Sequence, residues 1–237
     1  MNPADRLRAY PGLATMEPRL GSFPAPQRQL WPALVEVPLD FVLYGGSALA
    51  LRLDHRTSVD FDFFARRRFD PGDLVREIPL LRRGTVIQSA PDTLSVRVDG
   101  VRLSFFGVEI GAMEAPEVAV DNGVPVASLR DLAATKMKTL LDRAEAKDYL
   151  DVDAAITAGV DLPTALGDAR AIFGPAFEPL LALKAITFFE EPGLRDLDDA
   201  VRARLRAAAR AVSDIPRIEA RYASLLPDGL PARTLPR

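Results

Sequence analysis

The dominant spacing of the apolar residues in this chain changes near residue 126. Before that point they alternate with polar residues in short runs, which is typical of half-buried β-strands. After it they recur every three to four positions, which is typical of amphipathic helices. This single change predicts an α+β protein with two lobes: a mixed β-sheet flanked by helices, followed by a lobe built of helices.

The change in spacing also sets the expected division of the chain. We expect an α/β lobe over residues 27–125 and a helical lobe over residues 126–237. Residues 1–26 are rich in proline, glycine and arginine, so we expect a loosely packed N-terminal arm there. With 237 residues, of which 48% are hydrophobic, the chain can bury one core or two small lobes that share an interface.

Local signals place individual elements within these lobes. Pro32 interrupts the helix expected over residues 27–35 unless it lies in the first turn. Asp99-Gly100 is typical of a two-residue hairpin. The other expected elements are strands over residues 41–44, 59–64, 85–88, 93–98 and 101–106, a turn at 121–123, a helix over 70–78 capped by Asp70, a helix that starts after Ser128, and a helix over 147–158.

Residues 44–64, with the sequence YGGSALALRLDHRTSVDFDFF, carry the most specific pattern. Gly45 and Gly46 follow an apolar strand and let the backbone turn sharply and approach a ligand closely. Ser47 can cap the next helix, whose N-terminus presents free N–H groups and a positive dipole to a phosphate. A glycine pair alone is also compatible with a plain turn.

Two carboxylates follow on the next strand. Because strand side chains alternate between faces, Asp60 and Asp62 point the same way and Phe61 and Phe63 point the other. Two carboxylates beside a phosphate site can hold Mg²⁺ against a triphosphate. A solvated edge strand is the alternative interpretation. His55 is the only histidine, which leaves little material for a zinc site or a histidine-based catalytic network.

Cationic residues interrupt the apolar pattern of the helix that follows Ser128. Lys136 and Arg143 are seven residues apart and nearly superimposed along a helix axis, and Lys147 joins them if the helix continues. Such a row could reach across a cleft between the lobes to a triphosphate. Alternatively, these side chains extend to water and pair with neighbouring acids.

Several of these segments together resemble one known family over residues 30–200. The runs Gly45-Gly46-Ser47-Ala48-Leu49 and 55–63 resemble the first motif of the AbiEii/AbiGii-type nucleotidyltransferase toxins, a branch of the polymerase-β-like superfamily. Residues 131–136, Arg143 and 147–151 are similar to the later motifs of that family, in which a helix carries a lysine and a lysine-aspartate pair follows.

The resemblance implies a toxin of a toxin–antitoxin pair that uses Mg²⁺ and an NTP, with a cognate antitoxin as partner. Some members transfer a nucleotide to the 3′ end of tRNA. The resemblance implies catalytic roles for Asp60, Asp62, Lys136 and Asp148, metal binding by Asp60 and Asp62, and nucleotide binding by Gly45, Gly46, Ser47, Arg56 and Ser58.

The chain departs from that pattern on a later strand. Many superfamily enzymes place a third carboxylate there, where this chain has Ser104. A pair of carboxylates binds Mg²⁺ more weakly and leaves no general base on that strand, so Asp148 is a candidate to complete the site. Two other functions therefore stay open: modification of a protein side chain by nucleotidylation or phosphorylation, and binding of a nucleotide or antitoxin with little turnover.

Composition narrows the setting. There is no cysteine, which excludes disulfides and thiol chemistry, and we find no signal peptide and no apolar run near the roughly 20 residues that span a bilayer, so we expect a soluble cytoplasmic protein. The net charge of −3 does not indicate nucleic-acid binding. Arg202, Arg206 and Arg210, however, lie four apart and form a basic stripe, which is either a solvated helix face or a contact for tRNA phosphates or an acidic partner.

Overall fold

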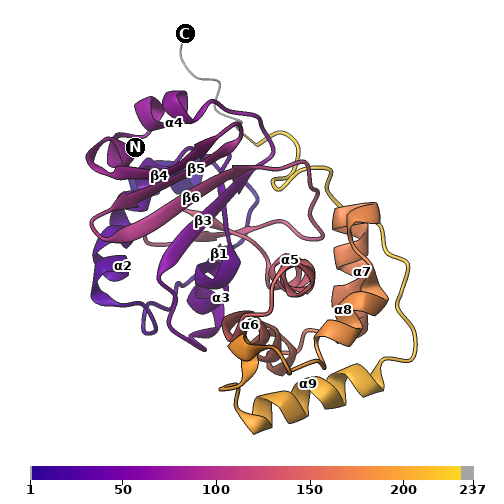
Figure 1. Cartoon of the computed structure of the whole chain (residues 1–237). Coiled ribbons are helices and arrows are strands. Elements are labelled where there is room, and N and C mark those ends of the chain that lie inside the picture. Colours follow the sequence, from indigo (N-terminus) through magenta and orange to yellow (C-terminus); the bar gives the residue numbers. More distant parts are fainter. Residues whose placement is uncertain (1, 231–237) are drawn as a thin grey trace.

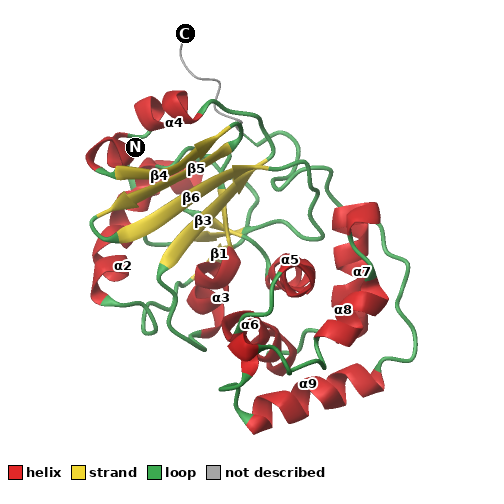
Figure 2. Ribbon diagram, in the orientation of Figure 1, coloured by secondary structure: helices red, strands yellow, loops and turns green. Residues whose placement is uncertain are grey.

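A computed structural model describes residues 2–230, and in that part of the chain a mixed β-sheet lies beside a group of helices (Figures 1 and 2). The strands of the sheet follow the order β1-β7-β8-β2-β3-β6-β5-β4. This architecture confirms the predicted α+β class. The strands are β1 (Thr15–Met16), β2 (Val42–Tyr44), β3 (Asp60–Ala65), β4 (Thr85–Ala90), β5 (Thr93–Val98), β6 (Val101–Gly107), β7 (Glu117–Ala119) and β8 (Pro125–Val126).

Helices α5 to α9 gather on one side of the sheet, whereas α2 and α4 lie at its other side (Figure 1). None of the helices found within residues 2–230 is both long and apolar enough to span a bilayer. Their bounds are α1 (Pro3–Arg8), α2 (Ala25–Leu30), α3 (Gly45–Leu53), α4 (Pro71–Glu77), α5 (Leu129–Asp142), α6 (Ala146–Thr157), α7 (Leu162–Phe173), α8 (Pro179–Ala185) and α9 (Asp199–Ala211), with short 3-10 helices at Trp31–Glu36, Pro79–Arg83, Gly174–Ala176 and Pro192–Leu194.

Capping and turn residues in the sequence predicted the ends of several of these elements. Asp70 caps α4 by accepting a hydrogen bond from the Asp73 backbone N–H, and Ser128 caps α5 in the same way. The β5–β6 hairpin turns at Asp99 and Gly100, whose φ angles of 50° and 84° lie in the left-handed region that such turns require. Local turn and cap chemistry therefore fixes these boundaries.

The N-terminal segment differs from its prediction, because it is packed rather than loose. Arg6 is 1% exposed, and its Nε donates a hydrogen bond to the Gly123 carbonyl at 2.8 Å. The Tyr10 hydroxyl donates to the Leu39 carbonyl at 2.6 Å, and Phe23 lies in the sheet core. Composition indicated a surface segment, but these long-range contacts are not visible in composition.

The helix expected over residues 27–35 also differs. It is split into α2 and the 3-10 helix Trp31–Glu36, with Pro32 in the first turn of the second piece. Proline is tolerated there because the missing N–H would have no partner in the first turn of a helix.

Residues 2–230 contain three hydrophobic clusters, of which the two larger ones lie around the sheet and among α5 to α9. The expected boundary at residues 125 and 126 falls within β8, and it stays a proposal. The chain crosses that boundary once more, because Leu225 is 2% exposed and packs into the sheet cluster. Near it, Tyr222 and Ala112 exchange two backbone hydrogen bonds, at 2.9 and 3.0 Å.

Candidate active site

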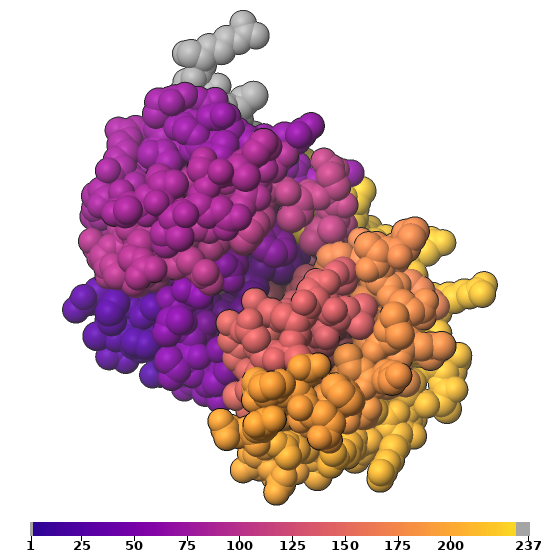
Figure 3. Space-filling model, viewed as in Figure 1, coloured from indigo at the N-terminus to yellow at the C-terminus, as the bar shows by residue number. Residues whose placement is uncertain are grey.

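A cleft of about 670 Å³ lies between the sheet and the helices. It follows the furrow between the purple-to-magenta and the salmon-to-orange parts of the surface (Figure 3). One wall comes from the start of α3 and from β3, β6, β5 and β4, and the other from α5 and α6. The residues predicted from sequence to form a site come from both walls.

The sheet wall carries the two carboxylates. Asp60 and Asp62 alternate along β3 with the fully buried Phe61 and Phe63, as strand geometry predicts, and both aspartates line the cleft. Burial, together with the negative charge of Asp60, raises the pKa of Asp62. Arg102 on the neighbouring strand places Nη2 2.6 Å from Asp60 Oδ2. The pair is thus a crowded negative site that attracts a cation.

The start of α3 lies against these carboxylates. Gly45 is the first residue of the helix, with φ at 73°, and a Cβ atom added there would lie 2.8 Å from Asp62 Oδ2. A Cβ atom on Gly46 would lie 2.3 Å from Arg56 Nη2. The absence of a Cβ atom at both glycines therefore leaves room for the side chains of Asp62 and Arg56 beside the first turn of the helix.

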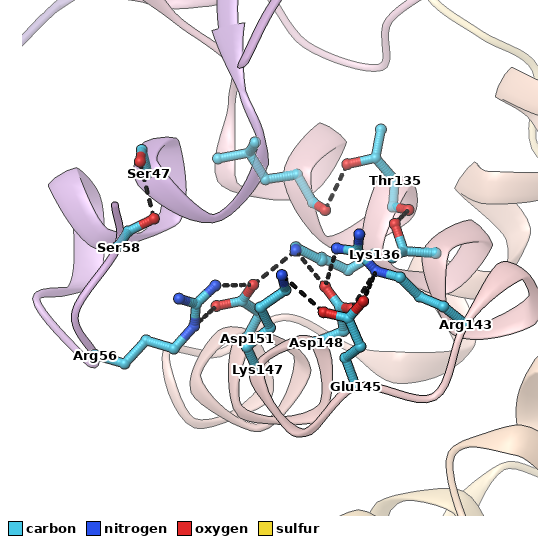
Figure 4. Close-up of polar contacts among 12 residues, drawn as sticks. Ser47, Arg56, Ser58, Thr135, Lys136, Arg143, Glu145, Lys147, Asp148 and Asp151 are labelled. Carbon is cyan, nitrogen blue, oxygen red and sulfur yellow. Dashed lines mark hydrogen bonds and ion pairs between the residues drawn. The ribbon is translucent and has the colours of Figure 1, made fainter. Parts of the chain in front are cut away.

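Ser47 does not cap α3, which corrects the sequence prediction. The helix begins at Gly45, two residues before Ser47, and Tyr44 occupies the N-cap position without a side-chain hydrogen bond. Ser47 is 2% exposed, its hydroxyl donates to the Asp60 carbonyl, and its Oγ lies 2.9 Å from Ser58 Oγ (Figure 4). Its hydroxyl thus links the start of β3 to α3 beneath the cleft, while Ser58 lines the cleft itself.

The helix wall is a network of buried ion pairs (Figure 4). Lys136 on α5 places Nζ 2.7 Å from Asp148 Oδ1 and 2.7 Å from Asp151 Oδ2, both on α6. Arg56 grips Asp151 with Nε and Nη2, each at 2.7 Å, and Arg143 donates from Nε to Asp148 Oδ2 at 2.8 Å. Because both aspartate side chains are fully buried, these cations supply the charge that burial requires.

His55 joins the same network, with Nε2 2.7 Å from Asp151 Oδ1. The sequence pattern made Asp148 the candidate to complete the carboxylate site, but it is Asp151 that contacts His55 and Arg56 of the 44–64 segment. The available signal was the spacing of three residues between Asp148 and Asp151, which places them on one face of α6.

The network shifts the pKa of each acid in one direction. Burial alone would raise the pKa of Asp148, but hydrogen bonds from Arg143 and Lys136 hold it below the ordinary value. Burial acts in the same way on Asp151, but its hydrogen bonds with His55 and Arg56 outweigh burial and hold its pKa well below the ordinary value. A carboxylate with a low pKa and a full set of partners is a weak base, so this geometry favours an anchoring role for Asp148 over a general base.

The predicted cationic row does not lie on one helix. Helix α5 ends at Asp142, and Arg143 has an extended backbone. Lys147 lies on α6 and pairs with Glu145 at 2.7 Å. The cations of the row nevertheless line the cleft, because the short turn between the helices folds back onto it.

The two sheet carboxylates fit a divalent cation in their chemistry. They present oxygen ligands on one face, and a cation would offset the burial and the repulsion from Asp60 that together raise the pKa of Asp62. Ser104 lies beside Asp62 in the register of β3 and β6, at the place where a third acid was sought. Within residues 2–230 no group of three or more acidic or histidine side chains is arranged as a metal site. Phosphate oxygens and water would have to complete the ligand shell.

The basic stripe of α9 lies elsewhere. Arg202 and Arg206 pack over the ring of Phe189, with their guanidinium carbons 5.9 and 4.9 Å from its centre. Arg202 also donates to the Leu194 carbonyl at 2.9 Å, and Arg210 is exposed. These residues do not line the cleft, so its charge is set by other groups.

Comparison with known proteins gives a family match over most of the chain. Residues 33–226 match the family described as "Nucleotidyl transferase AbiEii toxin, Type IV TA system". An uncharacterized Aquifex aeolicus protein, aq_aa25, is 37% identical over 115 residues, which cover 48% of this chain and 56% of that protein. The chain thus spans about half the length of this curated relative.

Two solved structures are reported for their similarity to this chain, and the fold likeness rests on the first of them. MenT4, a nucleotidyltransferase toxin from Mycobacterium tuberculosis, superposes with a TM-score of 0.55 at 18% identity, covering 78% of this chain and 82% of that one. JHP933 from Helicobacter pylori matches with a TM-score of 0.49 at 15% identity, covering 78% and 89%.

Proposed function

We propose that this chain, which belongs to the AbiEii family of nucleotidyl transferase toxins, transfers a nucleotide from an NTP to an RNA acceptor, with the 3′ end of tRNA as its target. One observation carries the proposal: two crowded carboxylates on β3 face a cationic helix wall across the cleft, beside the free N-terminus of α3. A triphosphate and a cation together match this arrangement of charge.

The nucleotide phosphates would lie over the start of α3. The backbone N–H groups at Gly45 and Gly46 point out of the first turn, and the helix dipole favours negative charge there. Arg56 and the Ser58 hydroxyl are the neighbouring donors in the cleft. Ser47 supports this site from below through Asp60 and Ser58 rather than by direct contact.

Asp60 and Asp62 would hold Mg²⁺ in place of the charge that Arg102 now supplies to Asp60. When bound, the ion would neutralise charge on the phosphates and orient them. Asp62 gains most from such a partner, because its charged form is the one that burial and Asp60 disfavour.

Lys136 would stabilise the charge that develops on the α-phosphate and on the leaving pyrophosphate. Asp148 and Asp151 hold its ammonium group in the cleft wall, which spares the reaction the cost of ordering a long side chain. In this proposal Asp148 positions Lys136 and Arg143, and it does not abstract a proton.

The test is transfer of label from α-labelled NTPs to total tRNA with Mg²⁺. The wild type should label the 3′ end of tRNA, whereas Asp60→Ala should abolish labelling and keep a normal circular dichroism spectrum and melting curve. Arg68→Ala, at an exposed arginine outside the cleft, is the control and should keep full activity. Unchanged labelling by Asp60→Ala would eliminate the proposed chemistry.

The acceptor and the setting are the finer parts of the proposal. We also propose a cytoplasmic location and a cognate antitoxin as partner, which the match to a toxin–antitoxin family supports. Label on a protein, or on this chain itself, would favour the protein-modifying alternative. Absence of transfer with all four nucleotides would favour a nucleotide- or antitoxin-binding protein with little turnover, an alternative that Ser104 in place of a third acid supports.

A further inference from the structure

The cleft extends past the carboxylates, along one row of side chains that crosses the sheet. In the strand register Asp62 is paired with Ser104, Ser104 with Ser95, and Ser95 with Gln88. Strands lie about 4.8 Å apart, so Gln88 lies about 14 Å from Asp62 across three strand spacings. All four side chains line the cleft, which therefore runs from β3 to the edge strand β4.

This row has buried polar groups at its centre. Ser95 and Ser104 are 5% and 2% exposed, and their hydroxyl oxygens lie 3.3 Å apart. Burial and the charge of Asp60 raise the pKa of Asp62, and the neighbouring Ser104 hydroxyl partly opposes that rise. Buried hydroxyls remain able to accept or donate further bonds to a ligand in the cleft.

Different chemistry borders the row on each side. On one side Phe64 and Phe106 are paired in register, with ring centres 5.5 Å apart at an interplanar angle of 82°. On the other side lies Arg102, whose side chain is 46% exposed. An aromatic surface, a polar row and a guanidinium thus lie side by side on the cleft face of β6.

The sheet order determines which reactant this surface can face. Strand β3, with the carboxylates, lies between β2 on one side and β6 on the other. Helix α3 begins at the end of β2, so the phosphates that leave as pyrophosphate lie on the β2 side. In phosphoryl-type transfer the attacking and leaving oxygens are roughly in line across phosphorus. The attacking group must then approach from the β6 side.

We infer that Ser104, Ser95, Gln88 and Phe106 form the subsite for the terminal nucleotide of the RNA acceptor. The inference rests on the proposed function and specifies where the acceptor lies. The 3′-hydroxyl oxygen bonds to the α-phosphorus, the bond from that phosphorus to the bridging oxygen of pyrophosphate breaks, and the hydroxyl proton passes to water. The products are RNA longer by one nucleotide and pyrophosphate.

The chemistry of the surface favours RNA over a protein side chain. Aromatic rings stack on unpaired bases, and side-chain amides such as that of Gln88 hydrogen-bond to base edges. Hydroxyls suit the donor and acceptor groups of a ribose. Arg102 is placed to meet a backbone phosphate once a cation replaces it beside Asp60.

The test separates the acceptor constant from the nucleotide constant. Gln88→Ala, Ser95→Ala and Phe106→Leu should each raise the KM for tRNA about tenfold, within the range known for loss of one stacking or base-edge contact. The KM for NTP should change less than about twofold, because these residues lie on the far side of β3 from α3. Gln88 is exposed, so its variant should fold normally.

Ser89→Ala is the matched control. Ser89 follows Gln88 on the same strand but pairs with Leu94, whose side chain lies in the core on the other face, and it does not line the cleft. Its KM for tRNA should equal that of the wild type. If the wild type transfers nucleotide to tRNA and Gln88→Ala, Ser95→Ala and Phe106→Leu keep its KM for tRNA, the subsite is overturned while the proposed function stands.

A binding measurement keeps the inference testable without turnover. Fluorescently labelled total tRNA should bind the wild type and Ser89→Ala equally, and Gln88→Ala about tenfold more weakly. This result would support the subsite even where transfer is absent and the proposed function fails. Equal binding by all three proteins, or no binding by the wild type, would overturn it.

Discussion

The two walls of the cleft use the same residue type in opposite electrostatic states. On the sheet wall Asp62 lies beside Asp60, and burial with this like charge raises its pKa. On the helix wall Asp148 and Asp151 are buried more fully, yet three cations hold their pKa values low. The two carboxylates of the sheet wall therefore share one cation, Arg102, and can accept another from a ligand, whereas the two aspartates of the helix wall are already paired with cations. Reactivity is expected on the first wall and rigid positioning on the second.

The largest expected effect is on the sheet wall. Asp62→Asn keeps the shape of the side chain and removes its charge, so nucleotide transfer should fall about 10³-fold or more, at the upper end for loss of a group that stabilises transition-state charge. Thermal stability should stay equal or rise, because a buried like-charge contact is removed. A lower melting temperature would show that this wall is structural as well.

The helix wall should respond in both properties. Lys136→Met should cost about 10²-fold in transfer. It should also lower the free energy of unfolding by about 3 kcal/mol, since it removes one partner from each of two buried carboxylates. Lys138→Met is the control, because the half-buried Lys138 pairs with the exposed Asp142 one turn along the same helix. Its cost should be about 0.5 kcal/mol or less in urea unfolding.

The walls should also differ in their pH dependence. A raised pKa means that the contribution of Asp62 to stability decreases as pH rises from about 3.9, the unfolded value, through the folded pKa. A lowered pKa means that the contribution of Asp148 is full above about pH 3.9 and is lost as pH falls toward its folded pKa.

The increase in the free energy of unfolding caused by Asp62→Asn should therefore disappear as the pH falls. The decrease in the free energy of unfolding caused by Asp148→Asn should become smaller over the same range. Urea unfolding of both variants and the wild type between about pH 3 and 7 measures the two trends, a range that follows from the unfolded value. Parallel stability curves for both variants would remove the distinction between the walls.

The smallest expected effect concerns a surface outside both walls. Arg210→Ala on α9 should leave stability within about 0.5 kcal/mol of the wild type, because the side chain is exposed. If α9 touches tRNA, the slope of log affinity against log salt should decrease by about one, since one phosphate contact is lost. An unchanged slope would identify the stripe as a solvated helix face.

Local sequence patterns predicted the sheet wall better than the helix wall. The alternation around Asp60 and Asp62 and the turn at Asp99-Gly100 depend on neighbours within a few residues. The contact between Arg56 and Asp151 joins residues 95 positions apart, and local sequence patterns cannot predict a pair so far apart in the chain. Ser47 is an example of a long-range contact that overrides a local preference. Serine is a common N-cap residue, but here the Ser47 hydroxyl donates a hydrogen bond to the Asp60 carbonyl instead.

The row formed by Ser104, Ser95 and Gln88 was not predicted from the sequence, because it too depends on contacts between distant parts of the chain. Each strand of residues 85–106 was predicted, but the row exists only through the registers of three strand pairs, including an irregular register between Val86 and Gln88. A shift of one residue would turn Gln88 to the opposite face. Sequence alone did not specify that register.

The return of Leu225 to the sheet cluster has a consequence for the order of folding. During synthesis the N-terminus of the chain leaves the ribosome first, and domains fold as they emerge. Leu225 can pack into the sheet cluster, and Tyr222 can pair with Ala112, only after the helical part has been synthesised. A nascent chain that ends before these residues therefore lacks part of the packing that supports the carboxylate wall, which couples completion of the active site to completion of synthesis.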